Sequence, residues 1–355
     1  MDRRISENVL KDQEIFVGLE DSKLSWKLCV RSGGIIVHET SMPAKYDILR
    51  GYFQNKFPGC KIKVIYEAGF RGFGLHDKLE TDGWDCIVTP PHTVTEEKCQ
   101  SQKNDRIDSR RLAKNLENKD YGSCNIPEKE LRENRQISRM YEQIKKDIIR
   151  ENNRIRRLLE FHGLDEDLKS GVWNQSDYKL LKENLDRMKL SPSIYFSLKV
   201  LLDKLFYLWE TRKTVIKQLR ELAKSEKYRK NTNLLKSVPG IGPLTAIRLV
   251  LEWGDLKRFK RKEEFSKFLG LIPREYSSGN TDHKGHITKQ GTRSVRGWLI
   301  ECSWVAIRHD PALLDKFNRV VKNCGSKKKA IVAVARKLAL RIRAVLLSRE
   351  EYIIG

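Results

Sequence analysis

Four acidic side chains hold positions from which they could share metal ions. Glu20 ends a strand-like run, VGLE, and Glu67 ends a second one, VIYE. Asp105 and Asp108 lie three residues apart where a helix is expected to begin, so both project from one helical face. Mg²⁺ prefers oxygen ligands, and two such ions about 4 Å apart activate a nucleophile and stabilise the leaving oxygen in phosphoryl transfer. The pattern therefore predicts a magnesium site, with two ions, held by these carboxylates.

The first of these positions is ambiguous, because Glu20 is followed directly by Asp21. Neighbouring side chains of a strand point to opposite faces of the sheet, so both cannot readily serve one site. The register of the strand favours Glu20. Taken singly, each acid also has an ordinary explanation, as a solvated residue at a strand end or, for Asp105, as a helix N-cap. The set of four is more specific than any member.

A second candidate for chemistry is a pair of serines, Ser277 and Ser278, which precede Gly279 in what we expect to be a polar loop. A serine hydroxyl is a poor nucleophile unless a base or metal activates it. Nearby cations would stabilise charge on a pentavalent phosphate, and the basic residues that follow are Lys284, His286, Lys289, Arg293 and Arg296. From the residues alone, an ordinary Ser-Ser-Gly loop remains the simpler explanation.

The acids need a scaffold, and the first third of the chain has the pattern of an α/β domain. We expect strands at Ile15–Leu19, Trp26–Val30, Gly34–His38, Lys61–Tyr66 and Cys86–Thr89. Helices are expected at Tyr46–Phe57, Phe73–Asp82 and through Asp108–Leu116. Strands followed by alternating helix and strand predict a mixed sheet flanked by helices.

Two apolar stripes at helical spacing follow. The first contains Ile137, Tyr141, Ile144, Ile148, Ile155 and Leu159, with polar Asn152 completing the series; the second contains Leu198, Leu202, Leu205, Trp209, Ile216 and Leu219. Two such stripes, separated by a loop rich in Gly, Ser and Asn, predict an antiparallel coiled-coil arm that could dimerise or hold domains apart. Two ordinary core helices would show the same stripes.

A helical domain is expected from about Leu234 onward. Its run VPGIGPLTA is typical of a helix-hairpin-helix, in which Gly240 and Gly242 would let backbone N–H groups approach a phosphate. A simple Pro-Gly turn between packed helices is the alternative. Further on, Lys316–Arg343 contains ten basic and no acidic residues. One face of this helix should pack, while the other meets phosphate or is merely solvated; the candidate contacts are Lys327, Lys328, Lys329, Arg336, Lys337 and Arg341.

The composition of the 355-residue chain agrees with a polyanionic partner. Lys and Arg total 70 against 47 acidic residues, a formal charge of +23, and each cation docked on a phosphate releases counterions. The seven cysteines show neither zinc-ligand spacing nor a disulfide framework, which favours a reducing cytoplasm. No apolar run is long enough to span a membrane, and the polar N-terminus lacks the apolar stretch of a signal peptide.

Four segments together carry a family resemblance: VGLEDSK, YEAGFRG, KNDRIDSRRLA and YSSGN…GHITKQGTRSVRGWL, in that order. They resemble bacterial insertion-sequence transposases with an acidic tetrad in an RNase H/RuvC-like domain and a separate C-terminal transposase domain, a family that includes pilin-gene invertases. The resemblance covers roughly residues 15–120 and 234–345. With the two apolar stripes between the matching regions, we expect an acidic domain at 1–122, a helical arm at 123–230 and a C-terminal domain with the serine loop at 231–355.

The resemblance also assigns roles. Glu67, Asp105 and Asp108 match the second, third and fourth acids, whereas the first position is usually Asp and is Glu20 here. The serine directly before Gly, Ser278, matches the family's nucleophile best, with Ser277 second. The implied reaction is a DNA recombination through a covalent phosphoserine link. Implied partners are donor and target DNA, a noncoding guide (bridge) RNA and further copies of the chain, as a dimer or tetramer acting on the nucleoid.

Two rival functions remain at this stage. A metal-dependent, structure-specific nuclease such as a junction resolvase would need the four acids but not the serine. A non-catalytic nucleic-acid-binding protein would need neither, and Glu20 in place of Asp is the one feature that supports it.

Overall fold

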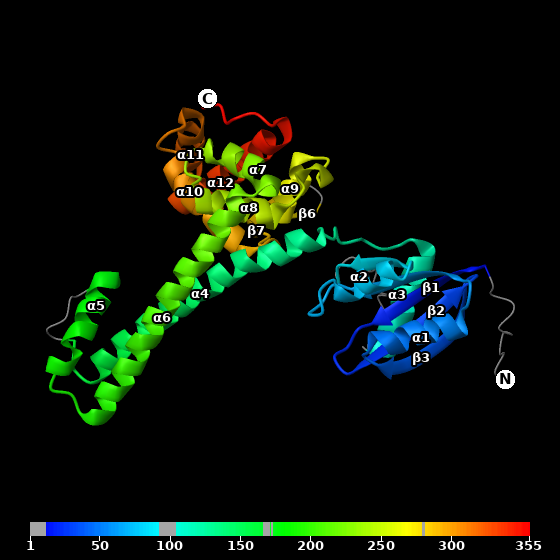
Figure 1. Cartoon of the computed structure of the whole chain (residues 1–355). Coiled ribbons are helices and arrows are strands. Elements are labelled where there is room, and N and C mark those ends of the chain that lie inside the picture. Colours follow the sequence, from blue (N-terminus) through cyan, green and yellow to red (C-terminus); the bar gives the residue numbers. More distant parts are fainter. Residues whose placement is uncertain (1–11, 92–103, 166–170, 172, 279–280) are drawn as a thin grey trace. The chain divides into compact units, whose positions relative to one another are not determined.

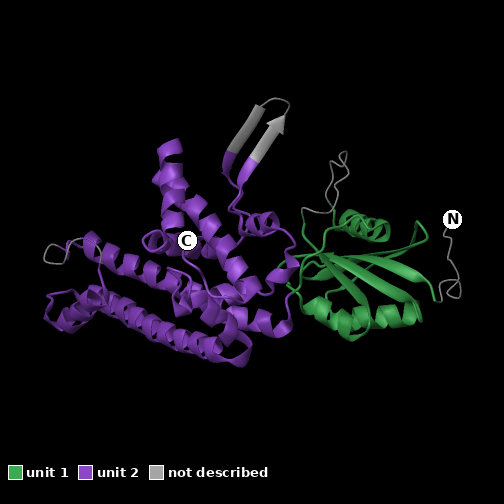
Figure 2. Cartoon of the chain, turned by 90° about the horizontal axis from the view of Figure 1, so that it is seen from above, with its two compact units in different colours: residues 1–126 green, residues 127–355 purple. Residues whose placement is uncertain are grey.

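The computed structural model describes residues 12–91, 104–165, 171, 173–278 and 281–355, with residues 275–278 and 281–284 described by their backbone only. The chain divides into two compact units, Met1–Ile126 and Pro127–Gly355 (Figure 2). The expected arm and the expected C-terminal domain therefore lie in one unit, and unit 1 ends at Ile126.

Unit 1 is built on one five-stranded sheet. Its strands are β1 (Glu14–Glu20), β2 (Ser25–Ser32), β3 (Ile35–Pro43), β4 (Lys61–Glu67) and β5 (Asp85–Thr89), in the order β3-β2-β1-β4-β5. The pairs β1–β2 and β2–β3 are antiparallel, while β1–β4 and β4–β5 are parallel. Parallel neighbours need crossover connections, which α1 (Tyr46–Lys56) and α2 (Gly74–Thr81) supply. The predicted mixed sheet flanked by helices is confirmed.

The two faces of this sheet carry separate cores. Ile15, Val17 and Leu19 of β1 pack in one cluster with Leu49 and Phe53 of α1. The intervening residues of β1 face the other way, toward α3 (Asp105–Asn118), whose Leu112 and Leu116 form a second cluster with Ile65 of β4. This alternation follows from the two-residue period of a strand. It determines which acidic side chains of the strands lie on the same face of the sheet as α3.

Unit 2 begins with two long helices, α4 (Lys129–Phe161) and α6 (Pro192–Lys224), which run side by side (Figure 1). Between them lie α5 (Gln175–Asn184) and a short 3₁₀ turn, η2 (Leu185–Arg187). Buried residues follow the predicted stripes on both helices, with three differences. Ile137 is partly buried, and Ser138 beside it is buried. Val215 is buried in place of Ile216, which is partly buried, and Glu151 is buried in place of Asn152. Arg154 and Lys204 pair with Glu151 at 2.9 and 3.0 Å.

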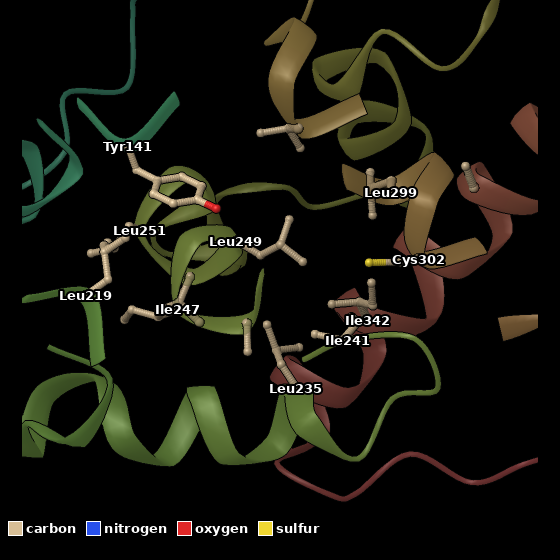
Figure 3. Packing of buried hydrophobic residues seen from close by; sticks show 14 of the residues in the cluster. Tyr141, Leu219, Leu235, Ile241, Ile247, Leu249, Leu251, Leu299, Cys302 and Ile342 are labelled. Atoms are coloured by element: carbon tan, nitrogen blue, oxygen red, sulfur yellow. The ribbon is translucent and has the colours of Figure 1, made fainter. Parts of the chain in front are cut away.

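Unit 2 continues with α8 (Pro243–Trp253) and eight further elements. They are α7 (Glu226–Lys236), η3 (Leu256–Arg258), α9 (Lys262–Leu269), β6 (Pro273–Ser278), β7 (Thr281–Ile287), α10 (Arg293–Ala306), α11 (Pro311–Cys324) and α12 (Lys327–Ser348). Figure 3 shows how Leu249 of α8, Leu299 of α10 and Ile342 of α12 converge in one apolar core. No described helix is long and apolar enough to cross a membrane.

The buried guanidinium of Arg248 contacts both the long helix α4 and helix α10. Arg248 of α8 is 4% exposed and lies between the rings of Tyr141 on α4 and Trp298 on α10, 4.6 and 3.8 Å from their centroids. Its charge is matched by Glu142 of α4, with which it forms an ion pair. A cation held between two aromatic faces and a carboxylate ties three helices at one point.

Candidate acidic centre and serine hairpin

Strand parity places Glu20 and Glu67 on the face of the sheet that α3 covers. In β1, Phe16 belongs to the α3 cluster, and Glu20 is an even number of residues further along. In β4, Ile65 contacts α3 and Glu67 follows two residues later. Leu19 and Tyr66 are paired across the parallel strands, so Glu20 and Glu67 follow at the C-terminal ends of two neighbouring strands. Asp21 has the opposite parity.

Helix α3 carries the other two acids, Asp105 and Asp108. They lie near the end of β1 because α3 packs closely against that strand at Gly18. A Cβ at that position would lie 2.1 Å from the carbonyl oxygen of Ser109 and 2.4 Å from the backbone nitrogen of Ala113. Asn104 is the N-cap of α3, since its side chain accepts a hydrogen bond from the Arg106 N–H at 2.9 Å. Asp105 is thus not the cap, and both Asp105 and Asp108 lie in the first turn.

The electrostatics of Glu20 show that the four acids share one neighbourhood. Burial, and then the negative charges of Glu67, Asp108, Asp21 and Asp105, raise the pKa of Glu20 to about 7. Like charges disfavour the ionised form of a carboxyl, and a bound cation would reverse that preference. Such a raised pKa beside other acids is typical of a functional site.

Asp21 differs from Glu20 in its surroundings. Burial raises its pKa to about 6, opposed by the charge of Arg71, and of the four acids Glu67 adds to the rise. Arg71 donates hydrogen bonds to the carbonyl oxygens of Asp21, Ser22 and Lys23, at 3.1, 2.9 and 2.8 Å, and so fixes the turn after β1.

A cation of the protein itself lies among these acids. The guanidinium of Arg111 on α3 is 3.2 Å from Glu67 Oε1 and 3.1 Å from Asp108 Oδ1. Its Nε is buried with no hydrogen-bond partner. As the side chains stand, no three of the described His, Cys, Asp and Glu residues are arranged to hold one metal ion. The donor set consists of four carboxylates, from the C-terminal ends of β1 and β4 and the first turn of α3, and fits a divalent cation chemically. In this conformation Arg111 supplies the positive charge.

The serines lie on a hairpin rather than in the loop we expected. Ser277 and Ser278 end β6, where Ser277 pairs with Asp282 and Ser278 with Thr281 of β7. The base of the hairpin is fixed against α9. The Thr288 N–H donates to the Ile272 carbonyl at 2.9 Å, and a Cβ on Gly291 would lie 2.2 Å from the Phe268 carbonyl oxygen. Gly279 and the side chain of Lys284 lie outside the described residues.

The predicted helix-hairpin-helix is a turn between α7 and α8 that packs on α10. Gly240 has φ +84°, and a Cβ there would lie 2.3 Å from the Cys302 carbonyl oxygen. Gly242 is the N-cap of α8, and Pro243 follows it at the first helical position. Packing therefore explains why Gly240 must be glycine, and contact of this turn with phosphate stays a prediction.

The predicted cationic contacts fall into two groups. Arg296 is 9% exposed and donates to the Gly291 carbonyl, and Arg341 pairs with Asp310, so both guanidinium groups are used within the protein. The others face outward at least in part: Lys289, Arg293, Lys327, Lys328, Lys329, Arg336 and Lys337. These two partners cannot be predicted from local sequence, because Arg296 donates to a backbone carbonyl and Asp310 lies 31 residues before Arg341.

Comparison with known proteins identifies two transposase regions. A model described as the transposase IS116/IS110/IS902 family matches residues 232–318, and a transposase model of the DEDD type from IS110 elements matches residues 21–163. The chain is an IS110/IS116-family transposase. The DEDD match implies an RNase H-like fold for unit 1, in agreement with its strand order, and favours use of divalent metal. It begins at Asp21, so Glu20 lies directly outside it.

Relatives that cover most of the chain are described as transposases, one of them for an insertion sequence. The putative transposase y4rJ of Sinorhizobium fredii is 27% identical over 368 residues, which cover 92% of this chain and 90% of that protein. The transposase for insertion sequence element IS1111A of Coxiella burnetii is 27% identical over 289 residues, 81% and 75% of the two chains. The pilin gene-inverting protein of Moraxella bovis is 32% identical over 108 residues, 30% and 34% of the two chains.

Proposed function

We propose that this transposase cuts and rejoins DNA at the ends of an insertion sequence, using a metal-bound acidic centre in unit 1 and a serine nucleophile in unit 2. The observation that carries the proposal is the convergence of Glu20 and Glu67 with Asp105 and Asp108 on one side of one sheet, where their charges act on one another. The single guanidinium of Arg111 offsets only part of the charge of four clustered carboxylates, so the cluster is destabilising unless a further cation binds, which indicates that the acids serve a site.

Glu20, Glu67, Asp105 and Asp108 would hold the metal, which we take to be a pair of Mg²⁺ ions. When bound, the ions would polarise the phosphodiester and stabilise the leaving oxygen. Glu20 is preferred to Asp21 because its side chain shares the α3 face with the other three. The longer reach of Glu, by one methylene, is compatible with its place at the end of β1.

Ser278 is the proposed nucleophile, with Ser277 as second choice. Its Oγ would attack the phosphorus and lose its proton, forming a phosphoserine link as the 3′-oxygen leaves and takes up a proton. The 3′-hydroxyl of a partner strand would then attack the phosphoserine, joining the strands and restoring the serine. Each step exchanges one phosphodiester for another, so no ATP is needed. The cations near the hairpin base would offset the charge that develops on phosphate.

The proposal includes partners beyond DNA. We propose a noncoding guide RNA, which the charge of +23 and the exposed lysines of α12 would serve as well as DNA. Strand exchange between two duplexes calls for a dimer or tetramer, and the paired helices α4 and α6 would act as a coiled-coil contact between copies. This places the reaction on the nucleoid, in the cytoplasm.

The test is cleavage of supercoiled DNA that carries the element ends, with the flanking noncoding DNA present and Mg²⁺ added. We expect Asp105→Ala to abolish cleavage and Ser278→Ala to abolish it as well. Asp47→Ala, which removes an exposed acid of α1, is the matched control and should leave cleavage unchanged. An active Ser278→Ala protein with an inactive Asp105→Ala protein would replace the proposal with a junction-resolvase-like nuclease, and activity in both would overturn it.

A further inference from the structure

A cavity of about 1060 Å³ opens in unit 2 between α9, α11, α12 and the base of the serine hairpin. Its floor is apolar. The floor side chains come from the hairpin base and from one half-exposed stripe of α12: Leu271, Pro273, Ile287, Val332, Ala333 and Leu340. An apolar hollow of this size on a surface is a binding feature that needs an occupant, because exposed apolar surface is otherwise unfavourable.

The rim of the same cavity is strongly cationic. It carries Lys262, Lys316, Arg319, Lys328, Lys329, Arg336 and Lys337, against one acid, Glu263. Arg319 pairs with Asp315 at 2.7 Å, and Lys337 donates to the Ala312 carbonyl at 3.2 Å. The other five rim cations form no ion pair among the described residues. So many unpaired charges of one sign around an apolar floor call for a ligand with an apolar part on the floor and anionic groups on the rim.

The position of the cavity relates it to the serines. Pro273 begins β6 and pairs with Ile287 of β7, and both line the cavity. Ser278 lies five residues along the same strand, which is about 17 Å at 3.3 Å per residue. A stacked strand rises 3.4 Å per nucleotide, so the cavity lies roughly five nucleotides from a phosphate at Ser278.

We propose that this cavity receives an unpaired nucleotide of the strand that the serine hairpin attacks, with the base on the apolar floor and its phosphates on the cationic rim. The inference rests on the proposed function. Exchange of strands unpairs a run of bases around the exchanged phosphodiester, and an unpaired base within that run is stabilised when an apolar pocket replaces its lost stacking. A base inside an intact duplex cannot reach the floor, so the cavity discriminates distorted or single-stranded DNA from duplex.

The test measures binding of the full-length protein to short DNA probes in EDTA, where no cleavage occurs. The probes are an oligothymidylate single strand, an abasic strand of the same length and a mixed-sequence duplex. We expect the oligothymidylate to bind at least tenfold more tightly than the abasic strand, since only the base contacts the floor. Equal affinity for the two strands would overturn the proposal.

The matched variants place a charge inside and outside the cavity. Val332→Glu puts a carboxylate on the floor, and Ile48→Glu introduces the same charge at an exposed apolar position of α1. We expect Val332→Glu to weaken oligothymidylate binding at least tenfold with little change for the duplex, and Ile48→Glu to match wild type. Circular dichroism checks that both variants fold. Equal losses for single strand and duplex would show a general charge effect and refute the pocket.

Two further outcomes separate this inference from the proposed function. If the wild-type protein binds none of the DNA probes, the proposed function itself fails. If it binds them all but a polyglutamate peptide displaces the oligothymidylate as well as unlabelled oligothymidylate does, the cavity is a site for acidic peptides, and only the present inference is wrong.

Discussion

Replacing Arg111 by Gln should make the acidic centre bind metal more tightly. The guanidinium lies 3.2 Å from Glu67 and 3.1 Å from Asp108, so an ion that uses these carboxylates must compete with it. Coulomb's law gives about 2 kcal/mol between a unit charge and a divalent ion about 5 Å apart with the screening of water. Because the side chain is partly exposed and can move away when the ion enters, we expect about 1.4 kcal/mol, a tenfold lower Kd.

The assay is a calorimetric titration of Mn²⁺ into the metal-free protein, with thermal unfolding in EDTA as a second readout. Arg111→Gln should lower the Kd about tenfold and lower the melting temperature without metal, because the carboxylates then repel one another uncompensated. Arg111→Lys keeps the charge and should stay near the wild-type Kd. Arg110→Gln is the control on the same helix, since Arg110 pairs with Glu39 instead.

A Kd that is unchanged or higher in Arg111→Gln would refute this reasoning. It would show that the guanidinium orients the carboxylates for the ion and does not compete with it. A merely structural role would lower stability and metal affinity together, whereas the competition described here moves them in opposite directions.

Three further predictions follow from packing and charge. Glu20 has a folded-state pKa of about 7. In EDTA the free energy of unfolding should therefore fall as pH rises from about 4.5 to 7, because Glu20 of the unfolded chain loses its proton in this range while the folded protein still binds it. Urea unfolding should find Glu20→Gln about 1–2 kcal/mol more stable than wild type at pH 8, after allowance for partial exposure, and equal stability would contradict the assigned burial. Gly18→Ala forces α3 away from β1, so it should weaken Mn²⁺ binding more than tenfold in a titration, and unchanged binding would exclude the close approach. Arg248→Met leaves Glu142 without its buried partner and should cost about 3 kcal/mol in urea unfolding, with a loss under 1 kcal/mol counting against the junction.

Much of unit 1 could be predicted from sequence because its signals are local. Strand ends, the helix at Asp105 and the preference for Glu20 over Asp21 all follow from a period of two along β1 and a period of 3.6 along α3. The structure agrees with those periods: Gly18, two residues before Glu20, is where α3 comes closest. The stripes of the long helices are equally local, and the buried residues differ from them by one position where Ser138, Glu151 and Val215 are buried in place of Ile137, Asn152 and Ile216.

What sequence could not predict depends on partners far along the chain. The spacing of Asp108 and Arg111 indicates an ion pair, but nothing local indicates that Glu67 completes it. Arg341 resembles its neighbours on a basic helix, yet it pairs with Asp310, because which side of α12 is covered depends on how α11 packs. The sequence predicts a loop for the two serines, because their strand exists only through pairing with β7.

The central claim, that a serine in unit 2 attacks DNA under control of the acidic centre, has one direct test. Trypsin cuts after Arg274 and Lys284 and so releases EYSSGNTDHK, which contains both serines. After reaction with element-end DNA and Mg²⁺, followed by nuclease digestion, mass spectrometry should find this peptide carrying a nucleotide on Ser278 in wild type and no such adduct in Asp108→Asn. A nucleotide on Ser277 would shift the assignment by one residue, and DNA cleavage with no adduct on this peptide would contradict the account.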